Sequence, residues 1–297
     1  MRLLKLLKLK NQIFFDFIEE NKTLLLILHF FILIGLVIWI LIPTLEEFGQ
    51  NFVSEILGVL ITILIINQII IIREEKRKLP HKFAVYDDIR MFVSSYMMFW
   101  QQAYQESVPE DDPEDIYQFF SDYGMGKIWT KLYLKSSPKS AVALSWYKLL
   151  IDYAKEIRDK GDNILTRHSQ YLTPQIYRTI HQITESQYLD VIKNMPKIKK
   201  YFQKYNIPVI NVLETFAVIK PSDKDYSAII SLYDWCETMY TELSGIDKTT
   251  TPVSRYIPRK NKQMPPTAMI PKHILDIEKE EWNMYLRSQM NNTQKFD

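Results

Sequence analysis

Two long apolar runs dominate the start of the chain. No charged side chain occurs in residues 23–42 or in residues 56–72. A helix of about 20 residues is about 30 Å long, which matches the hydrocarbon core of a bilayer. We therefore predict two transmembrane helices, over 23–42 and 56–72, joined by a short external loop over 43–55.

Charged residues flank these runs unevenly. Five Lys and Arg residues precede the first run and five follow the second by position 82, whereas the 43–55 loop carries three Glu residues and no cation. The positive-inside rule then places both flanks in the cytoplasm. We predict a multi-pass protein of the cell inner membrane, with the lipid bilayer as a partner and with both termini in the cytoplasm.

The first twenty residues have a different pattern. Apolar residues recur at helical spacing opposite basic and polar ones, which predicts an amphipathic helix over 1–20. Basic residues on the polar face suit the anionic inner leaflet, so we expect this helix to lie on the cytoplasmic surface of the membrane. The alternative is that it docks on the soluble domain.

Three polar residues interrupt the second apolar run, namely Thr62, Asn67 and Gln68. Polar side chains in lipid seek hydrogen-bond partners, commonly on another helix. One interpretation is a homo-oligomer in which these residues form an association interface or line a pore. In the alternative, Asn67 and Gln68 reach the inner headgroups, because they lie only a few residues before Arg73.

From Pro80 onwards the pattern is that of a soluble helical domain, over 80–297. Apolar residues recur at helical spacing between prolines, and only 7 glycines are available for tight turns. The sequence predicts a mainly α fold, in which a two-helix transmembrane hairpin precedes an all-α cytoplasmic domain. The expected helices are 83–107, 113–120, 140–159, one from Thr173 to Pro196, 208–219 (with a strand as the alternative), one beginning at Pro221-Ser222, and 274–290, with a turn from Gly124 to Gly126.

A loop rich in Thr, Pro and basic residues is predicted over 249–271. Its cations could contact the phosphate groups of a lipid, a nucleotide or RNA, although mixed basic loops are usually only solvated. The candidate phosphate contacts are Arg255, Arg259, Lys260 and Lys262.

Composition narrows the classes of function. The net charge of +2, with cations and anions well mixed, gives no strong signal for direct nucleic-acid binding. The single cysteine, Cys236, excludes an intrachain disulfide and fits a reducing compartment. It lies on the apolar stripe of its predicted helix, so we expect a buried, inert thiol.

No motif for catalysis, for a cofactor or for a metal is complete. The acidic stretch 106–115 lacks the Gly and the final Glu of an EF-hand loop, and the segment 124–127 lacks the spacer of a phosphate-binding loop. Ser136 and Lys139 have the spacing of a Ser-Lys pair, but Pro138 between them indicates a helix start. We expect no enzymatic activity and no catalytic, cofactor or metal residue. A polar pocket formed by several of the following residues would favour an enzyme instead: Asp122, Lys127, His168, Arg178, His181 and Arg255.

The string from Phe52 to Ile66 (FVSEILGVLITILII), followed by Arg73 to Arg77 (REEKR), resembles the hairpin of bacterial two-span proteins that accompany antiphage systems. These include the transmembrane effectors of retrons. The resemblance covers about residues 50–80, and no functional residue is carried over from it. It implies abortive infection, in which a protein or ribonucleoprotein partner holds the cytoplasmic domain inactive, and released hairpins associate and damage the inner membrane. The alternative is a non-catalytic anchor or scaffold that holds a cytoplasmic partner at the membrane.

Overall fold

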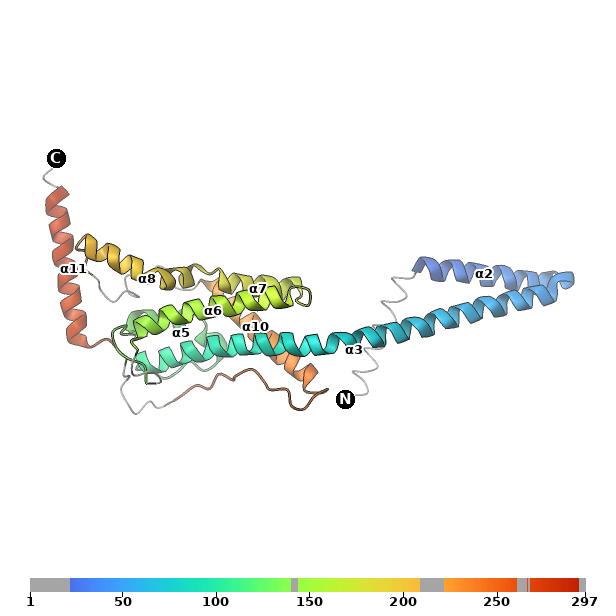
Figure 1. Ribbon diagram of the computed structural model, residues 1–297, viewed down its shortest axis with the longest axis horizontal. Coiled ribbons are helices and arrows are strands. Elements are labelled where there is room, and N and C mark those ends of the chain that lie inside the picture. Colours follow the sequence, from blue (N-terminus) through green and yellow to red (C-terminus); the bar gives the residue numbers. More distant parts are fainter. Residues whose placement is uncertain (1–21, 140–143, 209–221, 261–265, 267, 294–297) are drawn as a thin grey trace. The chain divides into compact units, whose positions relative to one another are not determined.

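The computed structural model describes residues 22–139, 144–208, 222–260, 266 and 268–293 (Figure 1). Within these residues the chain is mainly helical, as predicted, and its only β pairing is an isolated bridge between Leu132 and Met269. The chain divides into two compact units, Met1–Leu79 and Pro80–Asp297. The predicted helix over 1–20, Lys262, and all of the 208–219 segment except Pro208 lie outside the described residues.

The first unit contains α2 (Lys22–Leu41), the short helix η1 (Pro43–Leu45) and the first part of α3 (Glu46–Ser107). Glycines let the two long helices approach closely. A Cβ added at Gly35 would lie 2.7 Å from Cγ2 of Val53, and one added at Gly49 would lie 2.5 Å from the backbone nitrogen of Trp39. Both α2 and α3 contain a stretch that is long and apolar enough to cross a membrane.

The prediction of a loop over 43–55 is wrong for most of its length, because α3 begins at Glu46. Two features explain the early start. Glu46 and Glu47 in the first turn of α3 complement the positive end of the helix dipole. Gly49, which could have broken the helix, is instead required where the backbone of α2 passes at Trp39.

Helix α3 is 62 residues long, and its residues belong to both units. Pro80 lies inside it, so the separate helices expected over 56–72 and from position 83 are one continuous helix. Pro80 removes the hydrogen bond that its backbone would have donated to the carbonyl of Lys76. The side chains from Arg73 to Lys78 are exposed, so water can reach that carbonyl and the helix continues.

The second unit surrounds the remainder of α3 with shorter helices. Helix α6 packs against α7 and α8, and α7 packs against α10. Their bounds are α4 (Ile116–Phe119), α5 (Asp122–Lys131), α6 (Trp146–His168), α7 (Pro174–Thr184), α8 (Gln187–Lys204), α10 (Asp223–Leu243) and α11 (Lys272–Thr293).

Two predicted helix starts are confirmed. Thr173 caps α7, with its hydroxyl accepting from the backbone N–H of Ile176 at 3.3 Å. Ser222 caps α10 and forms a reciprocal capping box with Asp225. The start of α6 differs from the prediction, since its cap is Ser145 rather than a residue near position 140.

Two other predicted boundaries are wrong because tertiary contacts override local signals. Gly124 lies inside α5, where a Cβ would meet the carbonyl oxygen of Phe119 at 2.2 Å, so the glycine permits a tight approach of α4 rather than a turn. Pro196 lies inside α8, and the helix break comes earlier, after Thr184. There the Nε of Arg158 donates to the carbonyl of Thr184 at 2.9 Å and ends α7 against α6.

An aromatic cluster joins α3, α5, α6 and α8 in the core. The rings of Phe99 and Tyr153 stack with centroids 3.6 Å apart, and Trp100 lies 5.6 Å from both Trp129 and Tyr153. The hydroxyls of Tyr96 and Tyr188 share a hydrogen bond. Burial raises the pKa of the Tyr96, Tyr153 and Tyr188 hydroxyls, so these groups stay neutral and the core carries no charge there.

An extended segment over 251–260, here called the strap, lies along α3 (Figure 1). Side chains hold its backbone at intervals. Tyr86 donates to the carbonyl of Thr251, Ser94 accepts from the N–H of Ser254, and Gln101 donates to the carbonyl of Ile257, at 2.7, 3.0 and 2.9 Å. The predicted loop is therefore ordered over this part by contacts with α3.

We expect Gly161→Ala to destabilise the chain, although alanine normally favours a helix. Its Cβ would lie 2.1 Å from Cγ2 of the fully buried Thr184. Such overpacking costs about 1–3 kcal/mol, or roughly 3–10 °C in melting temperature for a domain of this size. Differential scanning fluorimetry of the detergent-solubilised chain measures the change.

Gly126→Ala is the matched control, because this helical glycine has open space at its Cβ position. We expect it to raise the melting temperature slightly, since alanine is better than glycine in a helix by about 1 kcal/mol. A Gly161→Ala melting temperature at or above that of the native chain would contradict the close approach of α6 and α7.

Candidate functional site

The three polar residues of the second apolar run differ in their hydrogen bonding. The Thr62 hydroxyl donates to the carbonyl of Gly58 in its own helix at 2.8 Å. Asn67 is half-buried and Gln68 is exposed, and within the part of the chain that the structure describes neither amide has a hydrogen-bond partner. Of the three, Asn67 and Gln68 are therefore the better candidates for bonds to another molecule.

The position of Asn67 and Gln68 follows from how α2 and α3 face each other. Gly35 of α2 lies opposite Val53 of α3, and Trp39 of α2 lies opposite Gly49 of α3. The two helices therefore run antiparallel, and earlier residues of α2 face later residues of α3. Because both helices have the same rise per residue, Lys22 at the start of α2 lies near the level of Asn67 in α3. The two amides therefore lie at the basic end of the apolar surface rather than at its middle.

The basic residues of the strap divide between two places. All three described cations are exposed, but Arg255 and Arg259 line a hollow of about 510 Å³ between the strap and α3, whereas Lys260 does not. Lys262 falls outside the described residues. The other residues that line this hollow are Met98, Phe99, Gln101, Gln102, Gln105 and Ile257.

Two carboxylates beside this hollow are bound by other groups. Asp112 accepts from the amide of Gln105 and from the backbone N–H of Arg259, both at 3.0 Å. Glu106 accepts from the amide of Gln102 at 2.9 Å and from the backbone N–H of Lys139 at 3.1 Å. Among the described residues, no ion pair involves the guanidinium of Arg255 or Arg259.

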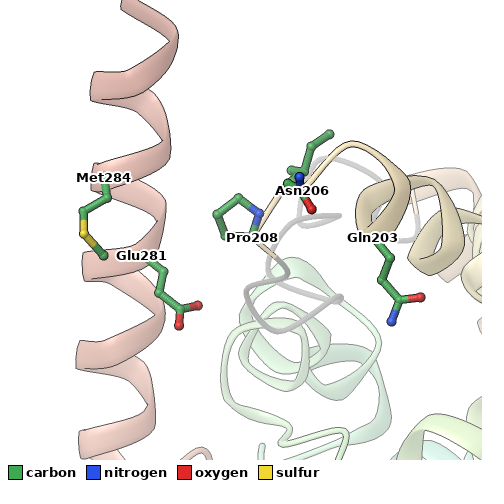
Figure 2. A pocket seen from close by; sticks show the side chains of 6 residues that line it. Gln203, Asn206, Pro208, Glu281 and Met284 are labelled. Atoms are coloured by element: carbon green, nitrogen blue, oxygen red, sulfur yellow. The ribbon is translucent and has the colours of Figure 1, made fainter.

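A second hollow, of about 500 Å³, lies between the end of α8 and α11 (Figure 2). Its polar groups are two amides and one carboxylate, which come from Gln203, Asn206 and Glu281. In Figure 2 the Glu281 carboxylate extends from α11 on the side of Pro208. This set contains neither a paired acid and base nor a nucleophile, so it does not indicate an active site.

The sequence-predicted chemical groups are scattered. Of the six residues that could have formed a polar pocket, only Arg255 lines either of these hollows. The described residues hold no cluster of three or more His, Cys, Asp or Glu side chains suited to a metal ion. The Ser136 hydroxyl donates to the carbonyl of Tyr133 at 2.6 Å, which makes it a turn residue rather than a nucleophile.

One charged cluster has no signal in the sequence. Asp88 of α3 accepts from Nε2 of the buried His168 at 2.8 Å and pairs with Arg167 at 3.1 Å, both at the end of α6. Eighty positions separate Asp88 from His168, so no motif could have joined them. Asp88 faces the Arg167 guanidinium and the His168 ring at the negative end of the α6 dipole, which suits a structural clamp between the two helices.

Comparison with protein families, with curated proteins and with solved structures finds no match to this chain.

The thiol of Cys236 is expected to be unreactive in the folded chain. Burial, reinforced by the nearby negative charge of Glu237, raises the pKa of this thiol to about 12, so the reactive thiolate is nearly absent at pH 8. Iodoacetamide should leave the native chain unmodified and add one group after denaturation, as read by mass spectrometry.

A Ser231→Cys variant is the control, because position 231 is exposed on the same helix. It should take up one group while folded. Modification of Cys236 in the native chain at a similar rate would show that α10 does not bury this thiol.

Proposed function

We propose that this chain is a membrane-anchored effector of an antiphage, abortive-infection system, which acts by oligomerisation and perturbation of the inner membrane. The observation that carries the proposal is α3: its first part is apolar and exposed, and its last part contributes Tyr86, Ile89 and Trp100, which are fully buried, to the core of the second unit. A single helix thus contributes to the membrane-directed surface and to the core of the domain that would receive a signal.

The exposed apolar surface supports membrane insertion. In α2, Ile40 is 72% exposed and Leu41 is 69% exposed, and in α3 the side chains of Ile61 and Ile65 are each 55% exposed. Transferring such side chains from water to an apolar environment is worth about 1.5–3 kcal/mol each. Under the proposal, α2 and the first part of α3 form a transmembrane hairpin.

The distribution of charged residues around the proposed hairpin supports its orientation in the membrane. Under the positive-inside rule, Lys22 and the basic segment from Arg73 to Lys78 belong in the cytoplasm, whereas Glu46 and Glu47 belong outside. The second unit and both termini would then be cytoplasmic. A protein or ribonucleoprotein partner bound to this unit would hold the effector inactive.

Oligomerisation follows from the size of the anchor, because two helices cannot enclose a pore. Asn67 and Gln68 supply side-chain amides that could bond to a neighbouring copy, and each such bond in a membrane is worth roughly 0.6–2 kcal/mol. The resemblance of residues 50–80 to the hairpins of antiphage proteins gives the same assignment. No step of this mechanism requires a catalytic residue.

The test is the membrane potential of bacterial cells that express the full chain. We expect the native chain to depolarise the cells, and Asn67→Leu/Gln68→Leu to lose most of this effect at equal expression. Losing both amides removes about 1–4 kcal/mol of association energy. A potential-sensitive dye, read beside immunoblots of the membrane fraction, gives the measurement.

Thr62→Val is the matched control for the polar face. The Thr62 hydroxyl already bonds within its own helix, so its removal should leave depolarisation unchanged. Absence of depolarisation by the native chain, with or without phage infection, would favour the alternative of a passive anchor or scaffold for a cytoplasmic partner.

A further inference from the structure

We propose that the hollow between α3 and the strap binds a phosphate-bearing ligand, with Arg255 and Arg259 as its anionic contacts. This inference does not depend on the effector proposal. It rests on the arginines that line the hollow, on the hydrogen bonds that hold its wall in place, and on its volume.

The strap places both arginines on the same side. In an extended segment side chains alternate, so residues 255, 257 and 259 share one face, and four residues span about 13 Å. Arg255, Ile257 and Arg259 all line the hollow, as alternation requires. The two guanidiniums therefore lie along one wall with Ile257 between them, a spacing that suits two anionic groups of one ligand or a single extended one.

The residues that line the hollow include two cations, Arg255 and Arg259, and no carboxylate. Glu106 and Asp112 accept from glutamine amides and backbone N–H groups. Guanidinium groups bind phosphate oxygens through two parallel hydrogen bonds, which makes arginine the preferred residue for such recognition.

The wall of the hollow is fixed by its own hydrogen bonds. Gln101 donates to the carbonyl of Ile257, and the backbone groups of Arg259 and Asp112 bond to each other, with Asp112 donating at 3.1 Å. Phe99 also lines the hollow, and its ring stacks on that of Tyr153. The strap is thus held in place without the arginine side chains, which leaves them available for a ligand.

The volume of about 510 Å³ falls within the range of about 300–1,000 Å³ that small-molecule sites occupy. A soluble nucleotide and a phospholipid headgroup both present phosphate oxygens and both fit this volume. The shared chemistry is the phosphate group, and the experiment separates the two sources.

The test uses the full chain in two forms. In detergent micelles the probe is ATP, measured by isothermal titration calorimetry, and in nanodiscs the lipid is phosphatidylglycerol or phosphatidylcholine, compared by hydrogen exchange of the strap. We expect saturable ATP binding, or strap protection that only the anionic lipid provides. Arg255→Ala and Arg259→Ala should each weaken ATP binding by about tenfold, or remove the lipid-dependent protection, since each loses one charge-assisted contact.

Lys260→Ala is the matched control, because it removes one cation from the same strap at a position outside the hollow. It should change the affinity by less than about twofold, and Arg255→Lys should retain part of the binding. Binding that Lys260→Ala weakens as much as either arginine variant would indicate diffuse charge and overturn the site. The site would also be overturned if the native chain, with an unchanged melting temperature, showed neither ATP binding nor protection of the strap by anionic lipid.

Discussion

The apolar side chains exposed along α2 and the first part of α3 need an environment other than water, and the rest of the account depends on this constraint. A lipid core offers no hydrogen bonds to the backbone, so a segment that enters it must satisfy its own N–H and carbonyl groups. Both segments do so, because both are helical over the whole apolar length. Gly35 and Gly49 add close backbone packing, which is a main source of helix association where the hydrophobic effect is absent.

The second unit is stabilised in a different way. Its core gathers aromatic rings from α3, α5, α6 and α8 around Trp100 and Tyr153. The Arg158 contacts with Thr184 and Asp190 then fix how α7 and α8 meet α6. The helix α3 supplies both apolar surface of the first unit and central rings of this core. Under the effector proposal, a change in packing around α3 would be the route by which a bound partner acts on the hairpin.

Features that depend on composition or on adjacent residues could be predicted from the sequence. The apolar helices, the helical class, and the caps at Thr173 and Ser222 are of this kind, because a cap needs only a hydroxyl and a free N–H a few residues away. Gly124 and Pro196 lie inside helices that they were expected to interrupt, and α3 continues through Pro80, because packing between helices and the access of water to a freed carbonyl decide whether a helix continues.

The candidate sites also combine features that the local sequence predicts with features that only the fold determines. The arginines of the strap could be identified as a group, but the hollow they line depends on Gln101 and Asp112, more than 140 positions away. The clamp of Asp88 with His168 was missed for the same reason. Local sequence carries the charge of a site, whereas the fold decides which charges are already paired.

The most direct test of the central claim is the topology of the proposed hairpin. In a Cys236→Ser background, single cysteines replace the exposed Glu47 and Lys78, and a membrane-impermeant maleimide is added to intact cells and to permeabilised ones. The account predicts that Glu47→Cys is labelled in intact cells and that Lys78→Cys is labelled only after permeabilisation. Labelling of Lys78→Cys in intact cells, or protection of Glu47→Cys until the cells are permeabilised, would contradict it.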